Sequence, residues 1–161
     1  MTKAGQPDVA CIALEPYPKE YDPILAQKIC NHWLRLTGLK WRGIIMIDWA
    51  NSDEMSRLNL RHTGNDKPTD VLSFTYDPPI IQPDSGDTVY GEIVICPTIA
   101  ENFAREHNES LELELTTLLT HGLLHLAGYD HGDTDERRRF EDLTHGIMGQ
   151  EGIKPVSLWL A

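Results

Sequence analysis

Residues 121–131 read His-Gly-Leu-Leu-His-Leu-Ala-Gly-Tyr-Asp-His, a stretch that contains three of the chain's seven histidines. They follow the helical run 111–119, and residues four apart on a helix lie on one face. His121 and His125 therefore project side by side. Gly128 tolerates the left-handed conformation that ends a helix, so a reversed chain can bring His131 over the first two histidines.

Three imidazoles that meet in this way leave one position of a tetrahedral metal open, as in a catalytic zinc site. Two histidines four apart can occur by chance, but the added glycine and third histidine favour a metal site. We predict that His121, His125 and His131 bind one Zn2+ ion per chain. Neutral imidazole also suits nickel, copper and iron, so the pattern does not distinguish zinc from nickel.

The same spacing occurs in the metzincin proteases, whose pattern is H-E-x-x-H-x-x-G-x-x-H. Gly122 stands where those proteases carry the glutamate that takes a proton from the attacking water. A chain without that carboxylate lacks the general base for peptide hydrolysis. The pattern therefore argues against a metalloprotease, an alternative that hydrolysis of a generic peptide substrate would revive.

The stretch resembles the signature H-G-x-L-H-L-x-G-Y-D-H of the YbeY family of bacterial endoribonucleases. The resemblance extends to Leu58-Asn59 and to residues 66–74, Asp-Lys-Pro-Thr-Asp-Val-Leu-Ser-Phe, which are similar to the family's second motif. It implies a four-stranded sheet with several helices and a metal at the end of a cleft. It also implies that His121, His125 and His131 are the zinc ligands.

The resemblance implies a function as well. The family cleaves single-stranded RNA with the help of a metal, matures the 3′ end of the small-subunit (16S) ribosomal RNA and takes part in ribosome quality control. RNA and the small ribosomal subunit would be the partners, in the cytoplasm. Zinc lowers the pKa of bound water to about 7 and polarises phosphoryl oxygens, so hydroxide is available without a strong protein base.

One position departs from the family pattern. YbeY proteins usually carry an arginine just before the glycine of the second motif, and this chain has Thr63 there. Threonine cannot supply a cation to stabilise the charge that develops on phosphoryl oxygens. We predict Arg61 or Lys67 as the catalytic cation; alternatively, each is solvated surface charge. Because Thr63 replaces that arginine, an alternative function remains: a non-catalytic, zinc-containing ribosome-assembly factor.

Length and composition limit the class of protein. The 161 residues are 40% hydrophobic and 24% charged, which suits one soluble domain over residues 1–161. No stretch approaches the ~20 apolar residues of a membrane span, and the N-terminus does not resemble a secretory signal. Cys11, Cys30 and Cys96 show no spacing pattern, which indicates reduced thiols in a cytosolic protein.

The net charge by itself does not favour an RNA-binding protein. Fourteen basic and 25 acidic residues give −11, whereas contacts to phosphate dominate the affinity for nucleic acids. Whether RNA binds depends on the local electrostatic field over the site, and a bound metal adds positive charge there. Acidic residues gather in 101–114 and 130–142, which we interpret as solvated helix faces. Arg137-Arg138-Arg139 is assigned to a charged helix face, with RNA binding as the alternative.

Local patterns predict the order β-α-β-α-β-β-α-α-α. Asp22-Pro23 begins the first helix, Ser52 is the expected N-cap of a second helix with His62 on its apolar stripe, and Asp133 is the expected N-cap of the last. Residues 77–87, with three prolines and a glycine, are the expected mobile loop. Early strands and late helices are typical of an α+β fold, here a small mixed four-stranded sheet with about five helices. The metal site is expected in a cleft after the long helix.

Other polar residues have more than one interpretation. Asp130 either orients a ligand imidazole or caps the turn after Gly128. Asp70 and Ser73 belong to the second motif, and Asp70 is expected to shape the cleft and the start of a strand. The remaining histidines outside both motifs are assigned to surface or core: His32, His107 and His145.

Overall fold

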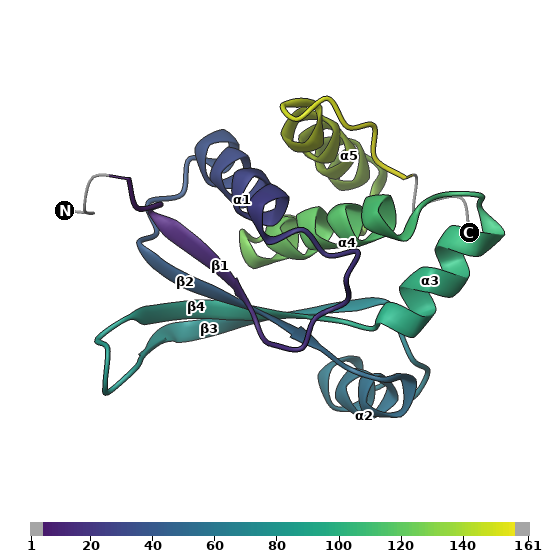
Figure 1. Cartoon of the computed structure of the whole chain (residues 1–161), viewed down its shortest axis with the longest axis horizontal. Helices are drawn as coiled ribbons and strands as arrows, with labels where there is room; N and C mark the ends of the chain where they lie inside the picture. The colour runs from purple at the N-terminus through teal and green to yellow at the C-terminus, as the bar shows by residue number, and fades with distance from the viewer. Residues whose placement is uncertain (1–4, 157–161) are drawn as a thin grey trace.

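The computed structural model describes residues 5–156, and its elements follow the predicted order (Figure 1). They are β1 (Val9–Ala13), α1 (Pro23–Thr37), β2 (Gly43–Trp49), α2 (Ser52–Thr63), β3 (Val71–Ile81), β4 (Thr88–Ile95), α3 (Pro97–Glu106), α4 (Leu111–Leu126) and α5 (Thr134–Gly149).

The strands form one mixed sheet in the order β1-β2-β4-β3. β1 pairs with β2 and β2 with β4 in parallel, whereas β3 runs antiparallel to β4. β1 and β2 are joined through α1, β2 and β4 are joined through α2 and β3, and β3 and β4 form a long hairpin. This is the α+β fold with a mixed four-stranded sheet that the sequence predicts.

Helices cover both faces of the sheet. In Figure 1, α1, α4 and α5 lie on one face and α2 lies on the other. The side chains of β4 alternate accordingly: Ile93 and Ile95 belong to the larger core, and Val94 belongs to a smaller core with Met55 of α2. A strand buried on both faces reads as a continuous apolar run, as the end of β4, Ile93-Val94-Ile95, does.

Two glycines allow α4 to lie close to the sheet. A Cβ atom on Gly122 would stand 2.8 Å from Cγ2 of Ile93, and one on Gly91 would stand 2.9 Å from Cδ2 of Leu126. The Ser73 hydroxyl of β3 donates a hydrogen bond to the Gly122 carbonyl at 3.0 Å. The middle of α4 is therefore fixed against β3 and β4, which form the antiparallel edge of the sheet.

Most helix ends follow the predicted chemistry, with one correction. The Asp22 carboxylate accepts from the amides of the first turn of α1, and the Asp133 carboxylate accepts from the Glu136 amide at 2.8 Å. The prediction of Ser52 as N-cap of α2 is wrong. Asn51 has the extended backbone that a cap needs, and its side chain accepts from the Glu54 amide at 2.9 Å.

The prediction of a loop over 77–87 is wrong for its first half. β3 continues to Ile81, and Ile80 pairs with Val89 of β4. Pro78 and Pro79 fall where the register shifts between Thr75 and Ile80. Prolines are tolerated there because no ladder hydrogen bond needs their missing N–H groups.

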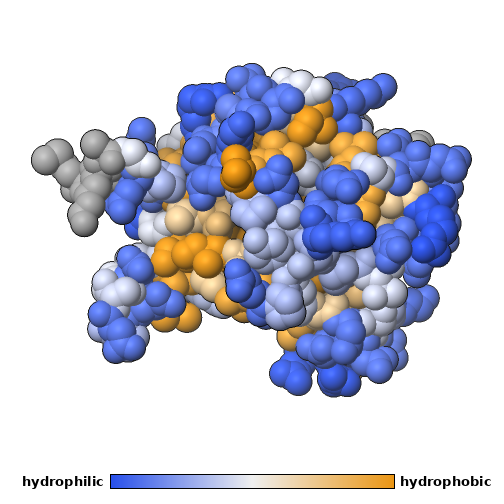
Figure 2. All heavy atoms as spheres, viewed as in Figure 1, coloured by the Kyte–Doolittle hydropathy of each residue, from blue (hydrophilic) through white to orange (hydrophobic). Residues whose placement is uncertain are grey.

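The surface is largely polar. In the view of Figure 2, hydrophilic side chains cover most of the molecule and apolar ones form scattered patches. Within residues 5–156, no helix is both long enough and apolar enough to span a membrane.

Candidate metal centre

The two sequence motifs meet in one cleft of about 640 Å³. Its walls come from the end of α2, the start of β3, the second half of α4 and the turn that follows α4. All three predicted histidine ligands and both polar residues predicted from the second motif line it. The lining residues are His62, Thr63, Thr69, Asp70, Val71, Leu72, Ser73, His121, His125, Asp130 and His131.

The third histidine reaches the cleft because the chain reverses after α4. Gly128 adopts the left-handed conformation, with φ of 92°, and the Tyr129 amide donates to the Leu124 carbonyl at 3.0 Å. This is the helix end that a glycine at this position predicts. The imidazoles of His125 and His131 consequently lie with their ring centroids 5.1 Å apart.

Phe140 of α5 forms the apolar floor under the histidines. Its ring is wholly buried, and its centroid lies 4.9 Å from that of His121, 5.0 Å from that of His125 and 5.4 Å from that of His131. The sequence shows Phe140 only as an apolar residue of the last helix. The fold adds that this one ring packs against all three imidazoles.

The tightest group of ligand atoms differs from the predicted triad. One atom each of His125, Asp130 and His131 lies within 4.8 Å of the others. His121 lines the same cleft but is outside this group. Asp130 also accepts a hydrogen bond from the His131 backbone amide at 2.8 Å, so its carboxylate both shapes the turn and faces the ligands. Ligation by the predicted triad stays a prediction.

Burial holds the cleft's inner imidazoles in the form that binds metals. Desolvation, followed by the charges of His125 and His131, lowers the pKa of His121 to about 3. Burial and His131 also lower the pKa of His125, against the opposing charge of Asp130. Neutral imidazole is the ligand form, so nitrogen donors with a neighbouring carboxylate fit zinc or another first-row divalent metal.

The predicted catalytic cations lie outside this cleft. Arg61 lines a different cavity of about 540 Å³, together with Asp48 and Glu92. Lys67 is exposed and absent from the lining of the histidine cleft, and its backbone carbonyl accepts from the Asn59 side chain at 2.8 Å. Among residues 5–156, no lysine or arginine lines the histidine cleft.

Thr63, by contrast, lines the cleft at the position where the family pattern has arginine. Its hydroxyl lies 2.9 Å from the Asn59 carbonyl and 2.8 Å from the Asn59 side-chain oxygen, and it donates to these acceptors. The short side chain is thus bound back onto its own helix. It adds no positive charge to the cleft.

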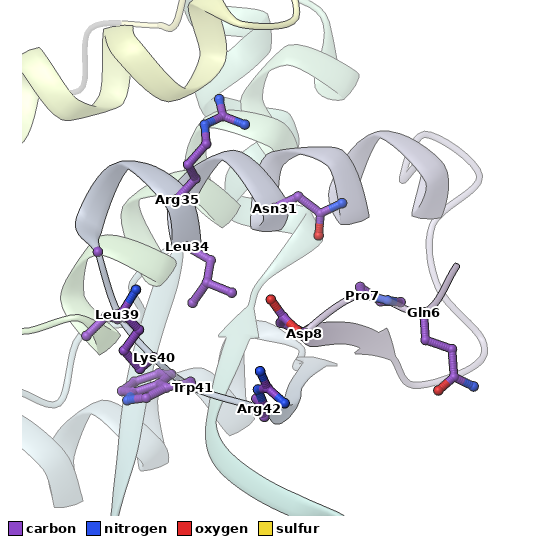
Figure 3. Close-up of a pocket in the computed structure, with 11 residues that line it drawn as sticks. Gln6, Pro7, Asp8, Asn31, Leu34, Arg35, Leu39, Lys40, Trp41 and Arg42 are labelled. Atoms are coloured by element: carbon purple, nitrogen blue, oxygen red, sulfur yellow. The ribbon is translucent and has the colours of Figure 1, made fainter. Parts of the chain in front are cut away.

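Another cavity, of about 700 Å³, lies between α1 and the starts of β1 and β2 (Figure 3). Arg35, Lys40 and Arg42 are among its lining residues, and Asp8 is the one carboxylate that residues 5–156 contribute. In Figure 3, Arg35 points toward α5, where its guanidinium donates to the Gln150 side chain at 3.4 Å. Without histidine or cysteine, this lining lacks the ligand set of the histidine cleft.

Sequence reasoning missed two ionisable residues. His62 was assigned to an apolar stripe, but it is exposed and lines the cleft. Glu114 is wholly buried, and within residues 5–156 neither of its carboxyl oxygens has a hydrogen-bond partner. Burial, followed by the charges of Asp70 and Glu109, raises its pKa to about 8. Helical spacing could have indicated that Glu114 is buried, because residues seven apart share a helix face and Glu114 precedes the predicted ligand His121 by seven.

Comparisons with known proteins agree with the motifs. Residues 18–152 match the family model described as Endoribonuclease YbeY. A Thermotoga maritima protein named Endoribonuclease YbeY is 46% identical over 94 residues, 57% of this chain and 57% of that protein. A Francisella tularensis protein of the same name is 36% identical over 135 residues, 81% of this chain and 80% of that protein. The match thus spans little more than half of the Thermotoga relative.

A solved structure supports the same assignment at the level of the fold. The solution structure of a Thermotoga maritima protein is similar with a TM-score of 0.54 and 28% identity, over 89% of this chain and 91% of that chain. The family model covers most of the chain, and both motifs meet in the one cleft that holds the three histidines. The chain belongs to the YbeY endoribonuclease family.

Proposed function

We propose that this protein is a zinc-dependent endoribonuclease that cleaves single-stranded RNA, matures the 3′ end of 16S ribosomal RNA and acts in ribosome quality control in the cytoplasm. The observation that carries the proposal is the convergence of His121, His125, Asp130 and His131 in one cleft of a YbeY-family chain. Related proteins named Endoribonuclease YbeY support the reaction class.

His125, Asp130 and His131 would hold the ion, with His121 as the predicted third imidazole. When bound, zinc polarises a phosphoryl oxygen and lowers the pKa of water, which is the chemistry that hydrolysis of a phosphodiester needs. Burial keeps the imidazoles of His121 and His125 neutral, and Phe140 packs against the histidine rings while the turn after Gly128 brings His131 into the cleft. The protein thereby prepares the donor set before an ion arrives.

The electrostatics of the cleft make a metal important for substrate binding. Asp70 and Asp130 line it, and no lysine or arginine in residues 5–156 does. Without a metal, an RNA phosphate in the cleft would therefore lie near carboxylates and no cation. Contacts of phosphate with positive charge dominate the affinity of proteins for nucleic acids, so a bound metal ion would supply the charge that binding needs. Arg61 and Lys67 could supply positive charge to a bound phosphate only if their exposed side chains moved toward the cleft.

The first test measures metal and cleavage on one sample. Protein purified without chelator should contain about one zinc ion per chain and cleave a single-stranded RNA, and a chelator should stop cleavage. His121→Ala should lose metal and cleavage, whereas His145→Ala, at an exposed position on α5, should keep both. Cleavage that persists in metal-free protein would contradict the proposal.

A non-catalytic ribosome-assembly factor is the second candidate, and the absence of lysine and arginine from the cleft lining in residues 5–156 favours it. It predicts bound metal and co-sedimentation with the small ribosomal subunit, but no cleavage. Thr63→Arg would then place a guanidinium in the cleft. Cleavage gained by this variant would identify the missing cation as the cause of inactivity.

The structure gives a physical reason against a metzincin-type protease. Position 122 faces Ile93 of the sheet, where a Cβ would lie 2.8 Å from Cγ2 of Ile93, so a glutamate there would be directed into the packing against the sheet and not into the cleft. The general base of those proteases therefore has no place in this packing.

A further inference from the structure

Breaking a phosphodiester bond requires a proton for the oxygen that leaves. A positioned side chain that donates this proton typically accelerates such a step by about 10²–10⁴-fold. In this protein, the candidates are the polar side chains that line the histidine cleft. Three of these, His121, His125 and His131, are the predicted zinc ligands, so the donor has to be sought among the remaining residues.

Each hydroxyl in the cleft already donates within the protein. The Thr63 hydroxyl donates to Asn59, and the Ser73 hydroxyl donates to the Gly122 carbonyl at 3.0 Å. The Thr69 hydroxyl donates to the Asp70 carboxylate at 3.4 Å. A hydroxyl has one proton to donate, so none of the three is prepared to protonate a substrate oxygen.

The carboxylates of the cleft are arranged as acceptors. Asp70 accepts from Thr69, and Asp130 accepts from the His131 amide at 2.8 Å. Burial raises the pKa of Asp70 against the hydrogen bonds that it accepts, so Asp70 is a second group in the cleft that can hold a proton, but it is less exposed than His62. Asp130 also lies in the tight group of ligand atoms with His125 and His131.

His62 is the exposed side chain of the lining that can transfer a proton, whereas Asp70 is half-buried. It lies in the last turn of α2, is exposed, and lines the cleft. Its ring packs on Phe74 of β3 with the centroids 4.7 Å apart and the planes at 59°. Within residues 5–156, no side chain or backbone group hydrogen-bonds to its ring nitrogens, so both are available to a ligand in the cleft.

We infer that His62 is a catalytic residue that donates a proton to the leaving oxygen of the RNA, an assignment that rests on the proposed function. The attacking oxygen forms a bond to phosphorus and releases its own proton to solvent. The bond between phosphorus and the leaving oxygen breaks, and that oxygen keeps the electron pair. It takes the proton from the His62 imidazolium and becomes a hydroxyl, and the imidazole regains a proton from water.

The primary test compares His62→Gln with His145→Gln, a histidine that is exposed on α5 and absent from the cleft lining. The single-turnover cleavage rate of His62→Gln should fall by about 100-fold or more. Zinc content and the Kd for a single-stranded RNA should change by less than about 3-fold, because glutamine keeps the size and the ligands are intact. The His145→Gln variant should match the wild type in all three measurements.

A substrate with sulfur in place of the leaving oxygen separates proton transfer from other roles. A thiolate leaves without protonation, so cleavage of this RNA by His62→Gln should approach the wild-type rate. The ends of the wild-type products first identify which bridging oxygen leaves. A purely structural role for His62 would leave the variant equally impaired on both substrates.

Three outcomes would overturn the assignment. They are an unchanged rate in His62→Gln, an equal loss on the sulfur substrate, and full activity in His62→Arg, since a guanidinium keeps its proton and that last result would show that positive charge alone is needed. A wild-type protein that binds zinc and cleaves no RNA would instead refute the proposed function, and the role of His62 with it. The wild-type rate therefore distinguishes the two failures.

Discussion

Helix α4 buries ionisable side chains at both of its ends, and the two ends have different consequences. Near its C-terminus, burial lowers the pKa of His121 to about 3 and keeps the imidazole neutral, which is the form that binds metal. In its first turn, burial raises the pKa of Glu114 to about 8 although a helix N-terminus favours the ionised carboxylate. Burial thus keeps the imidazole of a predicted metal ligand neutral at one end of α4. At the other end, it keeps a proton on a carboxyl group that has no hydrogen-bond partner within residues 5–156.

The difference shows that burial alone does not make a site. His121 and His125 lie beside His131 and Asp130 in a cleft open to solvent. Glu114 is absent from that lining, and its carboxyl oxygens have no hydrogen-bond partner in the part of the chain that the structure describes. Convergence of several donors, rather than a perturbed pKa, identifies the functional end of the helix.

The largest expected effect is at the histidine end. His125→Ala removes a member of the tight ligand group, so zinc affinity should fall by more than about 100-fold, since even indirect changes around a metal cost 10–100-fold. Equilibrium dialysis with zinc measures this loss. His107→Ala, at an exposed position after α3, is the control. Unchanged affinity in His125→Ala would remove this residue from the ligand set.

The next effect is at the acidic end. An unfolded chain ionises Glu114 near its usual value of 4.5, whereas the folded protein holds the proton up to about pH 8. The folded state therefore binds more protons between these values, and the free energy of unfolding falls as pH rises through them. Between pH 5 and pH 8, the free energy of unfolding of the wild type should fall by about 3 kcal/mol more than that of Glu114→Gln, measured by urea titrations. Glu112→Gln, exposed on the same helix, should keep the wild-type slope; parallel curves for wild type and Glu114→Gln would contradict the raised pKa.

The contact between α4 and the sheet should be sensitive to a single methyl group. Gly122→Ala places a Cβ 2.8 Å from Ile93, and overpacking of this kind should lower the free energy of unfolding by about 1–2 kcal/mol. Gly146→Ala on α5 meets nothing closer than 3.9 Å and should be stabilising by up to about 1 kcal/mol. Equal effects of the two substitutions in thermal or urea unfolding would show that α4 adjusts its distance from β4.

The smallest expected effect concerns the start of α4. The Ser110 hydroxyl accepts from the Leu113 amide at 3.1 Å, and Ser110→Ala should cost about 1 kcal/mol of stability. Ser110→Asp keeps an acceptor at the cap and should retain wild-type stability. Zinc affinity should not change in either variant, because the ligands lie at the other end of the helix. A loss of zinc with Ser110→Ala would show that the two ends are coupled.

Much of the site could be predicted because it depends on local spacing. Positions 121 and 125 share a helix face, and Gly128 ends the helix wherever it packs. The role of position 62 could not be predicted, since its apolar neighbours along α2 suggested a buried stripe. Only the edge strand β3 shows that the end of α2 opens onto the histidines.

The two corrections in the fold have similar causes. Asn51 and Ser52 are both good caps, and the backbone conformation decides between them. The extension of β3 through Pro78 and Pro79 required the partner strand β4, which a local pattern does not contain. Both errors arise where two local solutions are close in energy and the surroundings select one.

The sequence by itself determined the order of the elements, the α+β class and the histidine motif, because helical period, caps and glycines act over a few residues. Tertiary structure alone decided that both motifs share one cleft, that Arg61 lines another cavity, and that His62 lines the cleft. It also decided why position 122 is glycine, since the reason is the Ile93 side chain of a strand 29 residues earlier. Contacts between segments distant in sequence depend on packing, and no local pattern records them.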